Sequence, residues 1–561
     1  MKKSKRNIAV IISLIMCLSL LAACGGGGGS PAPSGGGSTT PSSSDSTRFD
    51  ASGGTTTGPT AAAPASTTAN LADHIDIIIN DTQITVLNPM LPAGSGGPSM
   101  WTYTLIHDFL VSQPSPGVLE PMLATEWSTD DYITFTLKLR DDVYFHNGEK
   151  FTADDVIWTA QYAKDNPSAP PNGTWRLMDS ITAIDPYTVK IVLNQMYVDF
   201  LSDLSGGMSG ILSKKAYEDN PDDASWGQIG TGPYKVTAFS SNDYCTVERT
   251  DNYWGEKPPT RSLTLWTIPE LSTRMVMMKN KEAQVSFQMT PEDLDLMETD
   301  PDFEIFPVMI NEPGIIGFND QGDAIMKDLN FRKAVAYALN YDDIAMVALG
   351  HWATASWDGN VWGPDTQYRV EGLPKREQDI ELAKEYLAKS VYKGETVTMI
   401  TTSPHYIRAS EIIQLQLEQV GIKLEVIQTD HAGLVDSLVY NPESTVQMHL
   451  FSMAMSYPAS AVFNSLTNRG LNRLNCNDPF VYELADRYKV ATDENERRDI
   501  AQELQLKYFF EDYHAIAAFW RVQGIAAIKG IGGMTLFTDQ FRHNLRGIYW
   551  DLDETPASLR P

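Results

Sequence analysis

Residues Leu123–Val156 read LATEWSTDDYITFTLKLRDDVYFHNGEKFTADDV, and the local fold is clearest in this stretch. Between positions 133 and 140 apolar side chains alternate with polar ones, which predicts a strand with one packed and one solvated face. Asn147-Gly148 is a dipeptide that tolerates positive φ, so we expect a tight turn there. Thr152 then caps a helix, with Asp155 completing a capping box.

The composition is that of a soluble globular protein with an acidic surface. A chain of 561 residues is long enough for two or three domains, and its apolar share of 42% is ordinary. The net charge of −28 argues against nucleic-acid binding, which requires basic patches. Four cysteines do not make a disulfide framework in so long a chain. Cys245 and Cys476 are left either to pair or to stay as buried free thiols.

The N-terminus has the features of a targeting segment followed by a tether. Residues 1–23 combine a basic start with an apolar run, Ile8 to Leu21, that is too short to span a membrane. They end in Leu-Ala-Ala before Cys24, which resembles a bacterial lipobox and implies that Cys24 is the lipid-attachment residue. The alternative is an ordinary signal peptide cut near Ala23. Residues 24–70 are rich in Gly, Ser, Thr and Pro, so we expect a disordered tether.

The remainder of the chain predicts two lobes joined by two crossings. Glu304 to Phe318 is extended and apolar and is interpreted as the first crossing, and Ala515 to Gln523 as the return. Between them, strand, helix and strand over residues 396–427 form a β-α-β unit, which predicts a parallel arrangement in the second lobe. Asp493 to Phe510 predicts a charged helix, and its charged residues, Arg497 among them, are interpreted as a solvated face.

Five motifs of the chain form a recognisable set: Arg140–Gly148, Phe151–Val156, Gly230–Tyr234, Asp251–Gly255 and Asn330–Leu339. Together they resemble the motifs of the extracellular solute-binding proteins of family 5, which serve ABC importers of oligopeptides, dipeptides and nickel. The resemblance implies an α/β class with α+β mixed sheets and a two-lobed periplasmic-binding-protein-like fold of type II, cluster C. It also implies an extra subdomain and a hinge of two crossings.

The same resemblance implies a division of the chain. The expected parts are a lipoprotein signal peptide (1–23), a tether (24–70), lobe 1 (71–311) with an inserted subdomain (about 114–218), lobe 2 (312–518) and a return to lobe 1 (519–561). Two lobes and two crossings place the ligand in the cleft between them.

The expected function is that of a lipid-anchored substrate-binding component of an ABC importer, which captures peptides or peptide-like solutes in the interlobe cleft. Its expected partners are the ligand, an ABC permease with separate ATPase subunits, and the membrane through the anchor. The resemblance implies a monomer on the extracellular face of the bacterial cell membrane. No His-Glu-x-x-His motif, Walker loop or nucleophile elbow is present, so neither an enzyme, a cofactor nor a metal is expected.

The ligand site predicted by resemblance departs from the family pattern. Peptide binders of this family place an acid before a tyrosine to receive the peptide ammonium, because a buried ammonium needs a paired anion. Here Tyr457 is kept, but Ser456 stands in the place of the acid. A neutral hydroxyl cannot balance an ammonium. A modified, cyclic or non-peptide ligand, or an acid from elsewhere in the chain, therefore stays open.

Aromatic and basic residues complete the candidate ligand-binding set. Trp357 lies in a loop with tryptophans on either side, either as an aromatic wall for the ligand or through local loop packing. Trp520 and Arg521 lie in the return crossing, where Arg521 either meets a ligand carboxylate or pairs with a neighbouring acid. Trp175, in the loop after the capped helix, is a further candidate.

Alternative functions remain open at this point. Capture of a nickel chelate, heme or another non-peptide solute fits the family, although the scattered histidines speak against a metal ligand set. A ligand-sensing receptor would have the same architecture. A surface hydrolase is the alternative from another class.

Overall fold

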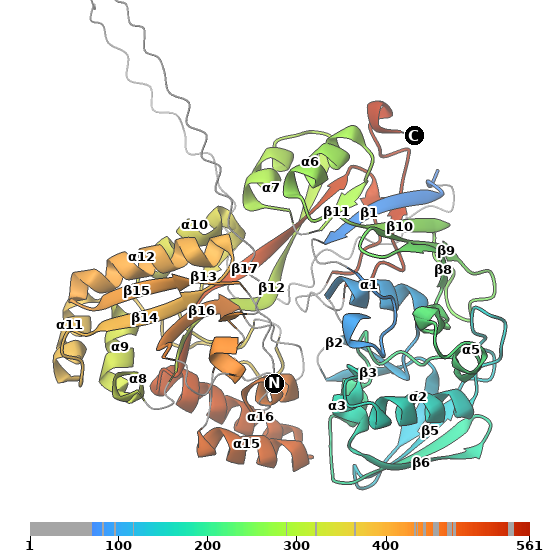
Figure 1. Ribbon diagram of the computed structural model, residues 1–561, viewed down its shortest axis with the longest axis horizontal. Helices are drawn as coiled ribbons and strands as arrows, with labels where there is room; N and C mark the ends of the chain where they lie inside the picture. Colours follow the sequence, from blue (N-terminus) through green and yellow to red (C-terminus); the bar gives the residue numbers. More distant parts are fainter. Residues whose placement is uncertain are drawn as a thin grey trace, which may run out of the picture. The chain divides into compact units, whose positions relative to one another are not determined.

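The computed structural model describes residues 70–560 except for short segments, and Figure 1 shows the arrangement of the elements. The segments left out are 81–83, 95–96, 116, 288, 320–322, 364–365, 431–432, 435, 441–444, 453–458, 468–473, 475–477 and 537–542. The predictions on the signal peptide, Cys24, the tether, Ser456, Tyr457 and Cys476 therefore lie outside the described residues.

The described strands form one large mixed sheet and several small ones. The large sheet has eleven strands in the order β15-β14-β16-β12-β17-β11-β1-β10-β9-β8, with β13 paired to β17. Its strands are β1 (His74–Asn80), β8 (Tyr234–Ser240), β9 (Tyr244–Arg249), β10 (Ser262–Thr267), β11 (Val285–Ser286), β12 (Phe303–Phe318), β13 (Ala353–Ala355), β14 (Thr396–Thr401), β15 (Lys423–Gln428), β16 (Met448–Ser452) and β17 (Ala515–Ile528). The predicted β-α-β unit is confirmed, because β14 and β15 are parallel and flank one helix in sequence.

The two extended segments predicted as crossings are the long central strands β12 and β17. They pair antiparallel, with Phe303 opposite Ile528 at one end and Gly317 opposite Ala515 at the other. β11 pairs with β17 near the first end, and β16 pairs with β12 near the second. One continuous strand pair therefore joins the two halves of the sheet, as Figure 1 shows.

A separate antiparallel sheet carries the stretch quoted above. Its strands are β4 (Ala124–Ser128), β5 (Thr134–Leu139), β7 (Thr188–Leu193) and β6 (Met178–Asp185), in that order across the sheet. Phe135, Leu137 and Leu139 are buried on one face of β5, which confirms the predicted alternation. Gly148 has φ 88° in the predicted turn. The Asp155 carboxylate accepts the Thr152 backbone N–H at 3.0 Å, so this half of the capping box opens helix α2 (Ala153–Asp165).

Helices cover the sheets, as α12 (Pro404–Val420) covers β14 and β15 in Figure 1. The apolar stripe of α12, for example, is buried at Ile413, Leu417 and Val420. The helices are α1 (Gly97–Ile106), α3 (Asn172–Trp175), α4 (Phe200–Asp203), α5 (Lys214–Asp219), α6 (Leu271–Asn280), α7 (Pro291–Glu298), α8 (Ala324–Lys327), α9 (Leu329–Ala338), α10 (Tyr341–Leu349), α11 (Ile380–Lys389), α12 (Pro404–Val420), α14 (Ala459–Thr467), α15 (Pro479–Val490) and α16 (Glu494–Leu504). The 3-10 helix η3 (Gly350–Trp352) follows α10, and a π-helical turn, η5 (Gln505–Glu511), follows α16. No helix in the described residues has the length and apolar character that a membrane crossing requires.

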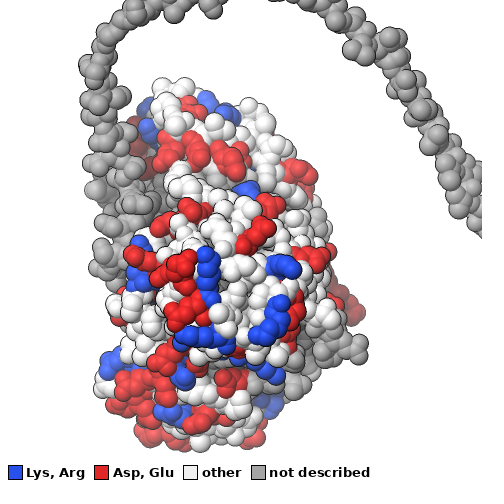
Figure 2. Space-filling view, turned by 90° about the vertical axis from the view of Figure 1, so that its left-hand side faces the viewer, with Lys and Arg blue, Asp and Glu red and all other residues white. Residues whose placement is uncertain are grey.

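One prediction about α16 is wrong. Arg497 was expected on a solvated face, but it is buried and forms an ion pair with Asp199. The charged neighbours Glu494, Glu496 and Asp499 are exposed as expected. A helix periodicity of 3.6 residues places Arg497 on the same buried stripe as Ile500 and Ala501, and the run of charges in the sequence concealed this. On the face shown in Figure 2, acidic and basic side chains are interspersed.

Candidate ligand site

The predicted site residues Trp520 and Arg521 lie at a bulge in the central strand pair. Met309 of β12 pairs with Val522, and Pro313 pairs with Trp520, so positions 310–312 of β12 stand opposite the single residue Arg521 of β17. Extra residues on one strand twist it locally and redirect their side chains, which is why bulges occur beside functional sites. This bulge places Glu312 against Arg521.

Glu312 and Arg521 form an ion pair between the two crossing strands. Arg521 Nη1 donates to Glu312 Oε2 at 2.7 Å, a short charge-assisted hydrogen bond. The two side chains are 13% and 29% exposed, so solvent screens this pair less than a surface pair. Of the two interpretations given for Arg521, pairing with a neighbouring acid is therefore the one present. The pair offers both a carboxylate and a guanidinium to an incoming polar group.

The first turn of α12 adds two groups that the sequence interpretation missed. Burial and the positive charges of Arg521 and Arg408 lower the pKa of His405 to about 2, so its imidazole is neutral. The buried Tyr406 hydroxyl interacts with the Ser452 and Arg521 side chains. His405 Nε2 is buried without a hydrogen-bond partner among the described residues. Tyr406 also packs on Phe519 of β17, with ring centroids 6.1 Å apart. The signal that would have found this turn is Pro404, a residue favoured at the first position of a helix.

Trp520 and Trp357 lie in different environments. Trp520 is buried in β17 and pairs with Thr354 of β13, so its ring is part of the packing around the crossing. Trp357 is half-buried, and its Nε1 donates to Asp342 Oδ2 at 3.2 Å. Lys375 Nζ lies 4.8 Å from the centre of the Trp357 ring, a cation–π contact. Trp357 therefore keeps an accessible surface, whereas Trp520 contributes through packing.

Three other tryptophans are core residues. Trp175 is fully buried in the core around the small sheet and packs edge-on against Phe200, with ring centroids 5.8 Å apart. Trp352 and Trp362 belong to two different hydrophobic cores. In this conformation Trp175 presents no surface to a ligand, and the loop tryptophans do not form a continuous wall. Of the two interpretations of this loop, local packing is therefore the one that applies to Trp352 and Trp362.

The remaining predicted residues are not placed. Ser456 and Tyr457, expected to meet the ligand, and Cys24, expected to carry the lipid, lie outside the described residues. Cys245 is a buried free thiol, and burial raises its pKa to about 12. Cys476, the residue with which Cys245 could pair, lies outside the described residues.

Residues of the motifs shared with family 5 form a buried polar network around Asp108 and line a pocket beside it. The carboxylate of Asp108 is fully buried and accepts Trp254 Nε1 at 2.8 Å and Tyr253 Oη at 3.2 Å. Arg546, from the tail, lies 2.9 Å from the same carboxylate. This network ties the end of α1 to the Asp251–Gly255 motif and to the C-terminal tail.

The pocket beside the Asp108 network has a volume of about 610 Å³. It is lined by Asp142, Tyr144, Phe145, His146, Gly148, Thr231, Thr250, Asn252, Tyr253 and Trp254. His146 is held by backbone groups, since its Nε2 lies 2.9 Å from the Gly232 carbonyl and its Nδ1 accepts the Gly230 N–H. Burial lowers the pKa of His146, and its two contacts with backbone groups hold the imidazole in the pocket wall.

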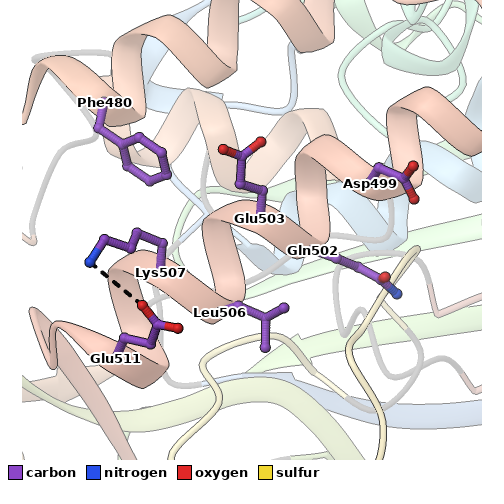
Figure 3. A pocket seen from close by; sticks show the side chains of 7 residues that line it. All are labelled: Phe480, Asp499, Gln502, Glu503, Leu506, Lys507 and Glu511. Carbon is purple, nitrogen blue, oxygen red and sulfur yellow. Dashed lines mark ion pairs between the residues drawn. The ribbon is translucent and has the colours of Figure 1, made fainter.

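A second pocket of about 560 Å³ lies on the surface of α15, α16 and η5 (Figure 3). It is lined by Phe480, Asp499, Gln502, Glu503, Leu506, Lys507 and Glu511. The ion pair of Lys507 with Glu511, 3.5 Å apart, closes one end. No residue of β12 or β17 lines this pocket, and three of its seven lining residues, Asp499, Glu503 and Glu511, are acidic.

Comparisons with known proteins agree with the motifs of the sequence. The profile of the bacterial extracellular solute-binding proteins, family 5 Middle, matches residues 118–472. The glutathione-binding protein GsiB of Escherichia coli K12 is 28% identical over 325 residues, which are 56% of this chain and 61% of that protein. The chain thus matches less than two thirds of this relative.

Solved structures share the fold at low sequence identity. NikA from Brucella suis, solved with Fe(III)-EDTA, superposes with a TM-score of 0.75 at 20% identity, over 85% of this chain and 99% of NikA. DppA from Helicobacter pylori, solved with the peptide STSA, gives 0.70 at 21% identity over 86% and 98%. The predicted mixed α/β, two-lobed periplasmic-binding-protein fold is confirmed. Because the family profile covers more than half of the chain, this protein belongs to the bacterial extracellular solute-binding proteins of family 5.

Proposed function

We propose that this protein is the substrate-binding component of an ABC importer and captures peptides or peptide-like solutes. Its family membership over residues 118–472 is the observation that carries the proposal. The relatives named above support it, since one is a glutathione-binding protein and another was solved with a peptide. Family members are binding proteins, so we expect no catalytic turnover.

The proposed ligand contacts centre on the bulge between β12 and β17. Glu312 would receive a ligand ammonium, which supplies the negative charge that Ser456 does not. Arg521 would meet a ligand carboxylate, for which its planar guanidinium is suited. His405, Tyr406 and the half-buried Trp357 would complete the polar and aromatic surroundings together with Tyr457 and Trp520.

Binding would stabilise a closed state, because only there does the ligand contact both lobes. Cys24 would carry the lipid anchor, and residues 24–70 would give the folded part reach from the outer face of the membrane. The closed form would then dock on a permease. Energy for transport would come from separate ATPase subunits, because no nucleotide-binding motif occurs in the sequence.

Native mass spectrometry of the protein purified without denaturation tests the proposal first. A co-purifying mass that fragments as a peptide is the expected result. If none is found, a thermal-shift screen of peptides, nickel chelates, heme and sugars follows, where a ligand at 100 times its Kd adds about 2.7 kcal/mol to the unfolding free energy. Stabilisation by a non-peptide alone would overturn the peptide proposal and retain solute capture.

Two further measurements separate the remaining alternatives. Sustained hydrolysis of a bound peptide, retained after repurification, would favour a surface hydrolase. The genetic neighbourhood distinguishes import from sensing: import predicts permease and ATPase genes beside this gene, and loss of ligand uptake when they are deleted. Loss of a transcriptional response with unchanged uptake would point to a receptor.

A further inference from the structure

The structure places two carboxylates and one imidazole together next to the strand crossing, in a cluster that sequence spacing does not reveal. Asp295 and Glu298 lie three residues apart on α7, so their side chains share one face of the helix. His351 comes from η3, which follows α10. The candidate ligand atoms of the three residues all lie within 4.8 Å of one another. We infer that Asp295, Glu298 and His351 form a binding site for a divalent transition-metal ion such as Zn²⁺.

The distances fit metal coordination closely. His351 Nε2 lies 3.6 Å from Asp295 Oδ1 and 3.6 Å from Glu298 Oε2. A tetrahedral ion with ligand bonds of about 2.0–2.2 Å keeps its ligand atoms roughly 3.3–3.6 Å apart. Both distances from His351 Nε2 to the carboxylate oxygens therefore already match the spacing between ligand atoms around such an ion. The third pair of ligand atoms, one from each carboxylate, lies within 4.8 Å. All three side chains are more than half exposed, so they have room to adjust around an ion.

The local charge favours a cation at this position. Among the described residues, the only basic group that forms an ion pair with Asp295 or Glu298 is His351. Glu292 and Asp293, in the first turn of the same helix, add further negative charge nearby. Two carboxylates around one imidazole thus leave an excess of negative charge, which a divalent ion would neutralise.

A buried tryptophan orients the cluster. Trp352 Nε1 donates to Asp295 Oδ1 at 2.8 Å, and only 4% of the Trp352 surface is exposed. The His351 ring packs on the Trp352 ring with centroids 4.7 Å apart. Metal-binding carboxylates and imidazoles commonly have such outer hydrogen bonds and packing, which fix their direction. A carboxylate oxygen has enough lone pairs to accept this N–H and still bind an ion.

The donor set selects the kind of ion. One imidazole nitrogen with two carboxylate oxygens suits Zn²⁺ or Ni²⁺, whereas Mg²⁺ and Ca²⁺ prefer oxygen ligands alone. Three protein ligands leave one position for water or for another donor group. In the sequence, α7 comes before β12 and η3 comes after it. A bound ion would therefore also link a segment that precedes this strand to one that follows it.

Isothermal titration with Zn²⁺ tests the inference, using purified protein without a histidine tag and after chelator treatment. We expect one equivalent bound with micromolar affinity, and at least tenfold weaker binding in His351→Ala and Glu298→Gln. Glu298→Gln keeps the side-chain shape, so the test does not depend on the folding of one variant. His74→Ala is the matched control, because His74 also lies beside a carboxylate, Asp76, at 3.4 Å but outside the cluster.

The outcomes separate a metal site from a simple ion pair. Equal Zn²⁺ binding by the wild type and by both cluster variants, or loss of binding only in His74→Ala, would overturn the inference. Absence of Zn²⁺ binding by the wild type would show that His351 and the carboxylates form ion pairs alone. Anomalous diffraction at the zinc edge adds a direct check, with the peak expected between the three side chains.

Discussion

Arg497 Nη2 donates to both carboxylate oxygens of Asp199, at 2.6 and 2.7 Å, although the two residues are 298 positions apart in the chain. Their side chains are 4% and 10% exposed. Arg497 also lies 4.0 Å from the centre of the Tyr488 ring. The pair joins the N-terminal end of α4, beside the small sheet, to α16. The expected division of the chain, with lobe 1 at 71–311 and lobe 2 at 312–518, assigns these two elements to different lobes.

Asp199→Asn is expected to destabilise this conformation strongly. Removing one partner of a buried ion pair leaves the other charge buried and uncompensated, which costs about 3–5 kcal/mol. Urea unfolding followed by tryptophan fluorescence measures the change. Arg487→Ala is the control, because its ion pair with Glu503 is about half exposed and surface pairs contribute about 0–1 kcal/mol. Equal, small losses in both variants would mean that the Asp199–Arg497 contact is not maintained in solution.

The stability of the protein should fall as the pH drops below about 6.5. Burial lowers the pKa values of His107, His449 and His543 to about 3. The unfolded chain, in which a histidine pKa is about 6.5, therefore takes up these protons first, and acid favours unfolding. Each such histidine lowers the unfolding free energy by about 2 kcal/mol at pH 5, relative to neutral pH.

His449→Leu provides the test of this pH dependence. Both ring nitrogens of His449 are buried without hydrogen-bond partners among the described residues, so leucine removes a buried polar group and a titrating one together. We expect a shallower fall in unfolding free energy between pH 6.5 and pH 4. Phe451→Leu changes the neighbouring ring, whose centroid is 5.0 Å away, and should leave the slope unchanged. An unaltered slope in His449→Leu would contradict the prediction.

Gly317→Ala should destabilise the central sheet. An added Cβ at Gly317 would lie 2.0 Å from Nε2 of the fully buried His449 on the neighbouring strand, so the ring or the backbone must shift. Overpacking of this kind typically costs about 1–3 kcal/mol. Gly206→Ala is the control, since an added Cβ there meets no atom within 4 Å. Thermal unfolding of the two variants makes the comparison, and equal melting temperatures would argue against the tight packing of His449.

A double-mutant cycle tests the proposed ligand contacts. Arg521→Gln and Glu312→Gln should each weaken binding of a peptide found by mass spectrometry at least tenfold, because each leaves a ligand charge or its partner unpaired. The double variant should lose less than the sum, since the two residues form one ion pair. Binding is measured by titration calorimetry, with Arg487→Ala as a surface control. Wild-type affinity in both single variants would remove the pair from the site.

Local structure was predictable where short-range physics decides it. The alternation on β5, the turn at Gly148 and the cap formed by Thr152 and Asp155 depend on neighbouring residues, and all three are present. The strands β12 and β17 were predictable from two long apolar segments of the sequence, because apolar segments of that length have few other ways to be buried. Arg497 was misplaced because its burial depends on Asp199, a partner far away in the chain.

The sequence by itself determined the family motifs, the main strands and helices, and the two crossings, because periodicity, caps and turns act over a few residues. Only the tertiary structure decided which charges are neutralised. The bulge brings Glu312 to Arg521, the helix stripe brings Arg497 to Asp199, and the packing of α7 beside η3 brings Asp295 to His351. Electrostatic interactions depend on distance in space, and residues far apart in the chain approach one another only after the sheets and helices have packed.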